Sequence, residues 1–317
     1  MHASPPRRTR LACLPASSLL IVAAFLWTIL ATAVQATAAL PVVTLERVRS
    51  GHFVVRAEIN GQPVRLVVDT GCPVTVLTEA AYRRLARPDA GSRLPAGDVR
   101  LRSLNGRPAR SGFVDDLHVG DSSLGGTHVA VAALEAVLGR GAGGHVADGI
   151  LGADSLHRSR AVLDLARRTL VLRGQAASND TRAGYVRVPA AYTTGRHLAV
   201  PCILAEDPYR FVVDTGSPFT VVRREVVRSE DLAQPARMAS MHTLGGDTLV
   251  AWVPLRRWNI GSFPVTRAIV GAGSFRGGIF DERTRAGGEV AGLLGLDWLV
   301  RWGAVIDFGE RAVYLRH

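Results

Sequence analysis

The chain contains one short motif twice, and this repetition constrains its fold more than any other feature of the sequence. Leu66–Cys72 reads Leu-Val-Val-Asp-Thr-Gly-Cys, and Phe211–Ser217 reads Phe-Val-Val-Asp-Thr-Gly-Ser. Each apolar, β-branched run predicts a buried strand, and each run ends in a carboxylate followed by a glycine turn. Burying a carboxylate is costly unless it is paired or changes its proton affinity. Two of them, one in each half of the chain, suggest that each is the partner of the other.

The repetition extends well beyond this motif. Residues 52–69 align without a gap with residues 197–214, at a spacing of 145 residues (214 − 69). Residues 148–156 and 161–172 each align with a segment that follows 143 residues later (297 − 154). Both halves therefore show the same order of predicted elements: strand, Asp-Thr-Gly, hairpin, an apolar-apolar-Gly turn, short helix and strand. We interpret the chain as a duplicated lobe.

A turn-type sequence interrupts strand-like surroundings between the two anchors of each half. These sequences are Leu104–Arg107 and Leu244–Asp247, and both contain glycine. Glycine-containing turns between apolar runs are typical of β-hairpins, so both segments are predicted hairpin tips.

The two Asp-Thr-Gly turns, each followed by an Ile-Leu-Gly or Leu-Leu-Gly turn, resemble those of the aspartic proteases. The compact lobes are similar to the retropepsin-like branch, as in bacterial aspartyl protease family proteins, rather than to pepsin. The resemblance covers residues 41–317 and implies an all-β fold, with two pseudo-symmetric retropepsin-like (acid protease) β-barrel lobes in one chain and an active-site cleft between them. The expected organisation is a leader over residues 1–39, lobe one over 40–174, a linker over 175–184 and lobe two over 185–317.

The resemblance makes Asp69 and Asp214 the predicted catalytic residues. Peptide hydrolysis without a metal or a nucleophilic side chain requires a base that activates water and an acid that protonates the carbonyl oxygen or the leaving nitrogen. Two adjacent carboxyl groups share a proton, because both cannot ionise at modest pH, and so supply both roles. Such a pair titrates as a unit, so neither role is assigned to one residue. The predicted activity is an aspartic endopeptidase acting on extended polypeptides. The alternative is a catalytically weak or inactive peptide-binding envelope protein on the same fold.

The residues that follow each aspartate are predicted to support the site. Gly71 and Gly216 allow a tight turn behind each carboxylate and leave backbone amides free to hydrogen-bond it. By resemblance, Thr70 and Thr215 reach across the lobe interface and lock the two turns together. The alternative is that these threonines are ordinary β-formers.

The fourth residue of the motif differs between the two lobes. Ser217 is expected to donate a hydrogen bond to Asp214, whereas Cys72 is a weak donor, so the sequence predicts an asymmetric pair. The repeat does not relate Cys72 to Cys202, the other cysteine beyond the leader, and both are interpreted as free, buried thiols.

The resemblance also implies that the hairpin tips act as flaps that close over an extended peptide, held partly by backbone hydrogen bonds as in strand addition. A structural hairpin is the alternative at the first tip. Neither tip carries the tyrosine of pepsin-like flaps, which favours the retropepsin-like branch. The candidate substrate-binding residues are Leu104, Asn105, Gly106, Leu244, Gly245 and Gly246.

Residues 1–39 have the pattern of a targeting segment. Three arginines lie among residues 7–10, an apolar stretch covers residues 19–34, and small residues follow at 36–38. This order predicts a cleaved secretory signal. The alternative is an uncleaved membrane anchor, because the apolar stretch is nearly long enough to span a bilayer. In both cases the protein is expected to be exported, to the periplasm or the medium.

Composition narrows the range of partners. All 38 basic residues are arginine, and the formal net charge is +11. The arginines are scattered, with no basic run interleaved with aromatic residues, which argues against nucleic-acid binding. A mild preference for acidic partners or anionic surfaces is an alternative use of this charge. The expected partner is therefore a peptide or protein substrate, with a membrane involved only if the leader stays as an anchor.

No spacing of histidines, cysteines and acids resembles a metal site, so neither a metal nor another cofactor is expected. His52 and His197, which the repeat relates, are interpreted as structural. Both predicted catalytic aspartates lie in one chain, so a monomer is expected.

Overall fold

A computed structural model describes the protein from residue 40 to residue 317, and Leu40–His317 forms one compact unit. Within it, the described residues leave out 86–97, 101–107, 135–137, 139, 142–143, 146, 175–181, 205, 229–236, 244–245, 256–257, 267 and 286. The predicted leader, most of the predicted linker and the tip residues Leu104, Asn105, Gly106, Leu244 and Gly245 therefore lie outside the described residues.

The apolar, β-branched runs form strands, as the sequence predicts. Strands β3 (Phe53–Ile59) and β4 (Gln62–Val68) make an antiparallel hairpin, and buried and exposed side chains alternate along β3 from Val55 to Ile59. Asn60 and Gly61 connect them with φ values of 51° and 76°. Positive φ at both central residues is characteristic of the Asn-Gly hairpin turn, which matches the twist of the flanking strands.

Lobe one consists mainly of one curled sheet. Its strand order is β6-β7-β10-β5-β13-β4-β3-β8-β9, with β2 beside β3, and β11 and β12 form a separate pair. The remaining strands of this half are β1 (Val42–Thr44), β2 (Glu46–Arg47), β5 (Val76–Thr78), β6 (Asp98–Arg100), β7 (Pro108–Val114), β8 (Leu117–Val119), β9 (Ser122–Ser123), β10 (Thr127–Ala132), β11 (Arg140–Gly141), β12 (Gly144–His145), β13 (Gly149–Leu151), β14 (Val162–Asp164) and β15 (Thr169–Val171).

Lobe two repeats this sheet strand for strand. Its order is β21-β22-β25-β20-β26-β19-β18-β23-β24, with β17 beside β18. The strands of this half of the chain, including those that belong to other sheets, are β16 (Val186–Pro189), β17 (Ala191–Tyr192), β18 (Leu198–Leu204), β19 (Asp207–Val213), β20 (Val221–Arg223), β21 (Arg237–Thr243), β22 (Gly246–Leu255), β23 (Trp258–Ile260), β24 (Phe263–Val265), β25 (Ala268–Gly273), β26 (Val290–Leu294), β27 (Val305–Asp307) and β28 (Ala312–Leu315). The all-β fold with two pseudo-symmetric lobes is thus confirmed.

Helices are few and short among the described residues. Helices α4 (Ala153–Arg158) and α6 (Leu296–Arg301) occupy equivalent positions after β13 and β26. Helix α2 (Glu79–Leu85) follows β5, whereas the equivalent segment after β20 is a single 3₁₀ turn, Arg224–Val226. A second 3₁₀ turn, Gly278–Asp281, precedes β26.

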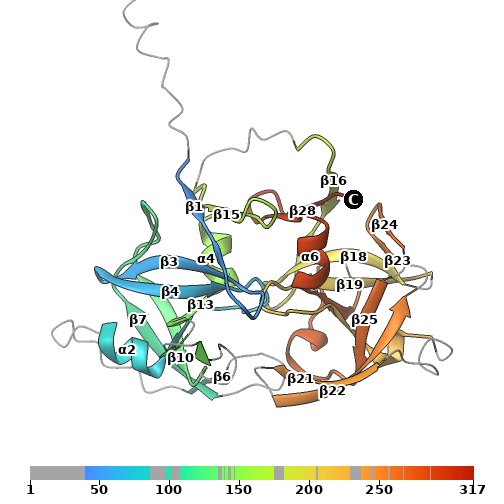
Figure 1. The fold of residues 1–317 in the computed structure, drawn as a ribbon, viewed down its shortest axis with the longest axis horizontal. Coiled ribbons are helices and arrows are strands. Elements are labelled where there is room, and N and C mark those ends of the chain that lie inside the picture. The colour runs from blue at the N-terminus through green and yellow to red at the C-terminus, as the bar shows by residue number, and fades with distance from the viewer. Residues whose placement is uncertain are drawn as a thin grey trace, which may run out of the picture. The chain divides into compact units, whose positions relative to one another are not determined.

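A six-stranded sheet joins the two lobes, and its order is β1-β15-β14-β27-β28-β16. The junction is the antiparallel pairing of β14 with β27, where Leu163 faces Ile306. In Figure 1 this sheet lies on the side of the unit opposite the hairpin β21–β22. One large apolar cluster contains core residues of both lobes, including Phe53 and Phe211, so the lobes share a core as well as a sheet.

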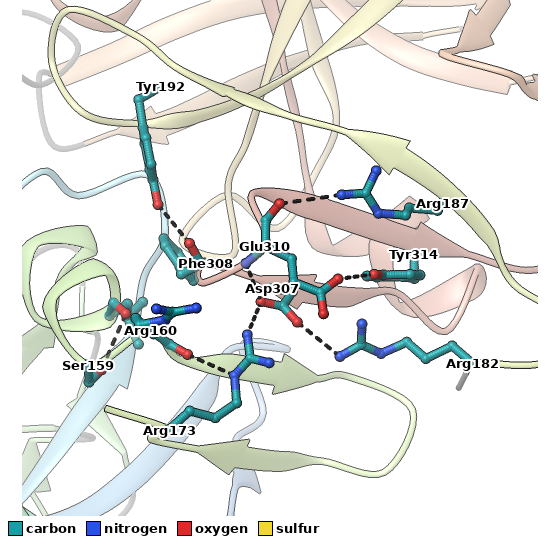
Figure 2. A network of polar contacts seen from close by, with 11 residues as sticks. Ser159, Arg160, Arg173, Arg182, Arg187, Tyr192, Asp307, Phe308, Glu310 and Tyr314 are labelled. Carbon is teal, nitrogen blue, oxygen red and sulfur yellow. Dashed lines mark hydrogen bonds and ion pairs between the residues drawn. The ribbon is translucent and has the colours of Figure 1, made fainter. Parts of the chain in front are cut away.

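A buried ionic network lies next to the shared sheet (Figure 2). Asp307, at the end of β27, is fully buried and pairs with Arg173 and Arg182, which are also buried. The repeat-related residue Asp164 pairs instead with the exposed guanidinium of Arg167. Both aspartates also accept a backbone hydrogen bond from the turn that follows, so the turn is conserved between lobes and only one lobe adds the buried ion pairs.

Candidate active site

Asp69 and Asp214 lie directly after β4 and β19, where the two lobes meet. Strand β13 runs parallel to β4, and the amide of Asp69 donates to the carbonyl of Leu151 at 3.1 Å. The same arrangement recurs in lobe two, where the amide of Asp214 donates to the carbonyl of Leu294 at 3.0 Å. Each Asp-Thr-Gly turn is therefore held by the apolar-apolar-Gly segment of its own half.

Thr70 and Thr215 connect the two turns through four hydrogen bonds. The hydroxyl of Thr70 donates to the carbonyl of Val213 at 2.6 Å and accepts from the amide of Thr215 at 3.0 Å. The hydroxyl of Thr215 donates to the carbonyl of Val68 at 2.7 Å and accepts from the amide of Thr70 at 3.1 Å. Both threonines are fully buried, so these bonds hold the lobes in a symmetric register without competition from water.

Backbone amides position each carboxylate. Oδ1 of Asp69 accepts from the amides of Gly71 at 2.8 Å and Cys72 at 3.0 Å. Oδ1 of Asp214 accepts in the same way from Gly216 at 2.8 Å and Ser217 at 3.0 Å. Each carboxylate keeps its second oxygen, Oδ2, clear of these amide bonds.

The glycines bring the two carboxyl groups together. A Cβ atom on Gly71 would overlap the carboxyl group of Asp214, and one on Gly216 would overlap that of Asp69. Each carboxyl group therefore lies against the glycine of the other lobe, a space that any larger residue would fill. The two carboxyl groups are close enough for each to affect the pKa of the other.

The surroundings of the two carboxyl groups raise the pKa of both. Burial, followed by the charge of Asp69, raises the pKa of Asp214 well above its usual range. Burial also raises the pKa of Asp69, while its amide bonds, above all that from Gly71, and the charge of His52 hold it down. Both pKa values are therefore raised, and they differ in the remaining causes: the charge of Asp69 adds to the rise at Asp214, whereas the charge of His52 opposes the rise at Asp69.

The asymmetry does not come from the hydroxyl of Ser217, and that expectation is wrong. Its Oγ donates to the carbonyl of Phe219 at 2.7 Å, and only the backbone amide of Ser217 reaches Asp214. Cys72 does the same, with Sγ directed at the carbonyl of Val74 at 3.2 Å. The side chain at this position closes its own turn. Cys72 and Cys202 are free and buried, as predicted.

His52 makes a contact with the opposite lobe that the repeat does not predict. Its Nε2 donates to the carbonyl of Gly216, in the opposite lobe, at 2.9 Å, and its Nδ1 contacts the hydroxyl of Ser50 at 2.8 Å. It lines a small cavity together with Asp69. The repeat-related His197 stays in its own lobe, where Nδ1 contacts Glu282 at 2.8 Å. Identical residues at related positions gave no signal of this difference.

A second pair of residues fastens each turn to its helix. The hydroxyl of Thr75 donates to Asp154 at 2.9 Å, and that of Thr220 donates to Asp297 at 2.8 Å. Both aspartates lie in the first turn of their helices, α4 and α6, where the helix dipole stabilises a negative charge. The pattern Asp-Thr-Gly-x-Pro-x-Thr, present in both halves, is the signal that would have revealed the threonines.

The described strands on either side of both predicted flap tips pair with each other. Strand β6 pairs with β7, and β21 pairs with β22 up to Thr243 opposite Gly246. Of the six candidate flap residues, the structure describes only Gly246, as the first residue of β22.

Among the described residues, no group of three or more histidines, cysteines and acids is arranged to hold a metal ion. In the same part of the chain, no helix has both the length and the apolar character needed to span a membrane.

Comparison with known proteins identifies the family to which the chain belongs. The aspartyl protease family model matches the chain twice, at residues 55–155 and 200–298, with one match in each lobe. The chain belongs to the aspartyl protease family, and its architecture is that of a retropepsin-like aspartic protease with two lobes. Among solved structures, the chain is similar to the crystal structure of aspartic proteinase from Irpex lacteus, at a TM-score of 0.53 and 14% identity, over 88% of this chain and 97% of that one. At this identity the likeness concerns the fold. A search of curated proteins found no match.

Proposed function

We propose that the protein is an aspartic endopeptidase that hydrolyses extended polypeptides with the Asp69–Asp214 pair. The observation that supports this proposal best is the packing of each carboxyl group against the glycine of the opposite lobe. It brings together a buried carboxyl group, that of Asp69, and a half-buried one, that of Asp214, and the pKa of both is raised. Two groups that share one proton supply a base and an acid at the same place.

The proposed reaction uses the pair as a unit. The ionised carboxyl takes a proton from a water molecule as the water oxygen bonds to the peptide carbonyl carbon, and the protonated carboxyl gives its proton to the carbonyl oxygen. The resulting tetrahedral species then breaks its C–N bond: the nitrogen takes a proton from the protonated carboxyl, and a hydroxyl of the tetrahedral species gives its proton to the other carboxylate, which leaves a carboxylic acid, an amine and the pair with one proton again. The pair titrates as a unit, so the base and acid roles are those of the pair, and the charge of His52 acts on it from the side of Asp69. The fixed amide bonds to both Oδ1 atoms keep this geometry prepared before substrate arrives.

The hairpins β6–β7 and β21–β22 are the proposed flaps. A peptide in extended conformation satisfies its backbone groups by pairing with strand edges, and this mode of binding suits a protein built from sheets. Side chains near the second hairpin supply apolar contact area: Phe219, which is 44% exposed, packs edge-on against Trp252 at 5.1 Å.

The test is cleavage of a mixed peptide library by the full chain from about pH 3 to pH 8. Asp69→Asn and Asp214→Asn should each abolish the cuts made by the parent, while Asp164→Asn, a turn residue away from the pair, should keep them. Cuts that survive both substitutions would place the activity elsewhere. A folded parent that binds peptides without cutting them would support the alternative, a catalytically weak or inactive peptide-binding protein on the same fold.

We also propose that the protein is exported, on the evidence of the pattern in residues 1–39. Cell fractionation followed by N-terminal sequencing tests this. A new terminus close to residue 40 in an extracytoplasmic fraction supports a cleaved signal, an intact terminus in the membrane fraction supports an anchor, and a cytoplasmic product contradicts export.

A further inference from the structure

A pocket of about 1010 Å³ lies beside the shared six-stranded sheet and contains neither Asp69 nor Asp214. Its walls come from β16, β17, the turn after β17 and the turn between β27 and β28, together with the segment around residue 283. In Figure 1, β16 and β28 lie on the side of the unit opposite the hairpin β21–β22. The volume is at the upper end of that of small-molecule sites, and the proposed protease chemistry makes no use of it.

The lining of this pocket is strongly cationic. Glu310 is the single acid among the residues that line it, and its carboxylate accepts a hydrogen bond from Tyr314 (Figure 2). Tyr192 and His157, whose rings meet edge-on at 4.7 Å, add an aromatic wall, and Thr194 adds an exposed hydroxyl. The arginines that line the pocket are Arg187, Arg196, Arg283, Arg285 and Arg311.

The positive charges of several of these arginines are not neutralised by a paired carboxylate. Arg283 pairs with Glu289 at 3.3 Å. Within the described part of the chain, Arg196, Arg285 and Arg311 form no ion pair with a carboxylate. Burial and the charges of Arg196 and Arg311 lower the pKa of His157, which is the response expected of an imidazole in a positive field.

The backbone at Arg196 provides an independent observation. Arg196 has a φ of 68°, in the left-handed region, which residues with a side chain adopt less readily than glycine. The repeat relates it to Gly51, which has a φ of 89° in the same turn of lobe one. Lobe one therefore carries the residue that the turn favours, and lobe two carries an arginine that lines the pocket.

We propose that this pocket binds a small soluble ligand that carries two or more phosphate groups. The guanidinium fork matches phosphate oxygens in bidentate geometry, and arginine is the residue best suited to such recognition. Phosphate groups offer nearly two charges and three strong acceptors each, so a ligand with several of them can engage the whole set of arginines within one pocket. The aromatic wall and the hydroxyl of Thr194 leave room for an uncharged part of the same molecule.

The experiment is isothermal titration calorimetry of the full chain with inorganic tripolyphosphate, in a buffer of physiological ionic strength. The central variant is Arg196→Gly, which removes one charge from the pocket and gives the turn its preferred residue, so it should fold at least as well as the parent. Its matched control is Arg168→Gly. Arg168 is also an exposed arginine with a positive φ, 55°, but it lies in a turn of lobe one and does not line the pocket.

The parent should bind tripolyphosphate with a stoichiometry of one, Arg196→Gly should bind about tenfold more weakly, and Arg168→Gly should bind like the parent. Arg285→Gln, which leaves the turn at residue 196 unchanged, should weaken binding in the same way. Three results would overturn the proposal: no binding by the parent, an equal loss in Arg196→Gly and Arg168→Gly, or binding of citrate as tight as that of tripolyphosphate. The second would mean diffuse charge attraction, and the third a preference for charge without a preference for phosphate.

Discussion

The hydroxyl of Thr215 offers the sharpest test of how the two lobes are held together. Thr215→Val removes the hydroxyl and leaves a side chain of nearly the same size and shape. The hydroxyl donates to the carbonyl of Val68 and accepts from the amide of Thr70, at 2.7 and 3.1 Å. Thr215 and Thr70 are fully buried, so water cannot replace the lost partner.

The expected cost follows from those two contacts. A buried polar group left without a partner costs about 1–3 kcal/mol, so the carbonyl and the amide together predict a loss of about 2–6 kcal/mol in the free energy of unfolding. Thr215→Ser keeps the hydroxyl and loses one methyl group, which predicts a loss of about 1 kcal/mol. The difference between the two variants isolates the hydrogen bonds from the packing.

Urea unfolding followed by tryptophan fluorescence and by far-ultraviolet circular dichroism measures both variants against the parent. Thr70→Val should cost a similar amount, because the repeat gives it equivalent partners at 2.6 and 3.0 Å. The double variant should lose less than the two single losses combined, since the four bonds belong to one network. The reasoning is refuted if Thr215→Val unfolds within about 1 kcal/mol of the parent, or if Thr215→Ser is equally destabilised.

Three further predictions follow from the same structure. Asp307→Ala should lower the free energy of unfolding by about 3–5 kcal/mol, because two buried arginine charges lose their partner. Asp164→Ala should lower it by about 1 kcal/mol or less, because the arginine that pairs with Asp164 is exposed. Thermal and urea unfolding measure both losses, and equal losses contradict the prediction. The raised pKa of Asp214 means that the folded protein holds this proton more tightly than the unfolded chain does, so its contribution to stability is full below about pH 4 and is lost as the pH rises from there. Asp214→Asn should therefore gain stability relative to the parent as the pH rises above about 4, and a difference that is constant with pH would contradict the prediction. His52→Gln should move the acid limb of the kcat/KM profile to higher pH, because the cation that holds down the pKa of the neighbouring aspartate is gone, whereas His197→Gln should leave that limb in place; the same shift in both variants would assign it to general destabilisation.

Much of the fold could be predicted from the repeat. The two strands that end in Asp-Thr-Gly, the hairpins and the short helices after each apolar-apolar-Gly segment all appear as separate, local patterns, and each pattern occurs twice. The glycines illustrate why this succeeds. Gly152 and Gly295 are needed because a Cβ at either would overlap the backbone of Val74 or Phe219, so the constraint is steric and leaves a visible residue preference.

Side-chain hydrogen bonds at the site could not be predicted in the same way. Ser217 differs from Cys72, and the sequence favours a bond from its hydroxyl to Asp214, but the closer acceptor is the carbonyl of Phe219. The choice between two acceptors depends on a rotamer, which the backbone of the turn determines. His52 and His197 show the same limit, because identical residues at related positions have partners in different lobes.

The sequence by itself determined the duplicated all-β lobe, the pairing of two strand-end aspartates and the need for glycine and threonine beside them. These are consequences of short-range sterics and of the cost of burying a charge, which act within a few residues and repeat with the motif. Only the tertiary structure decided the sheet that β14 and β27 share across the lobes, the burial of Asp307 between two arginines and the arginine-lined pocket. Those features arise where segments far apart in the chain meet. The two lobes share a single interface, so the contacts made there have no repeat-related copy in the other half.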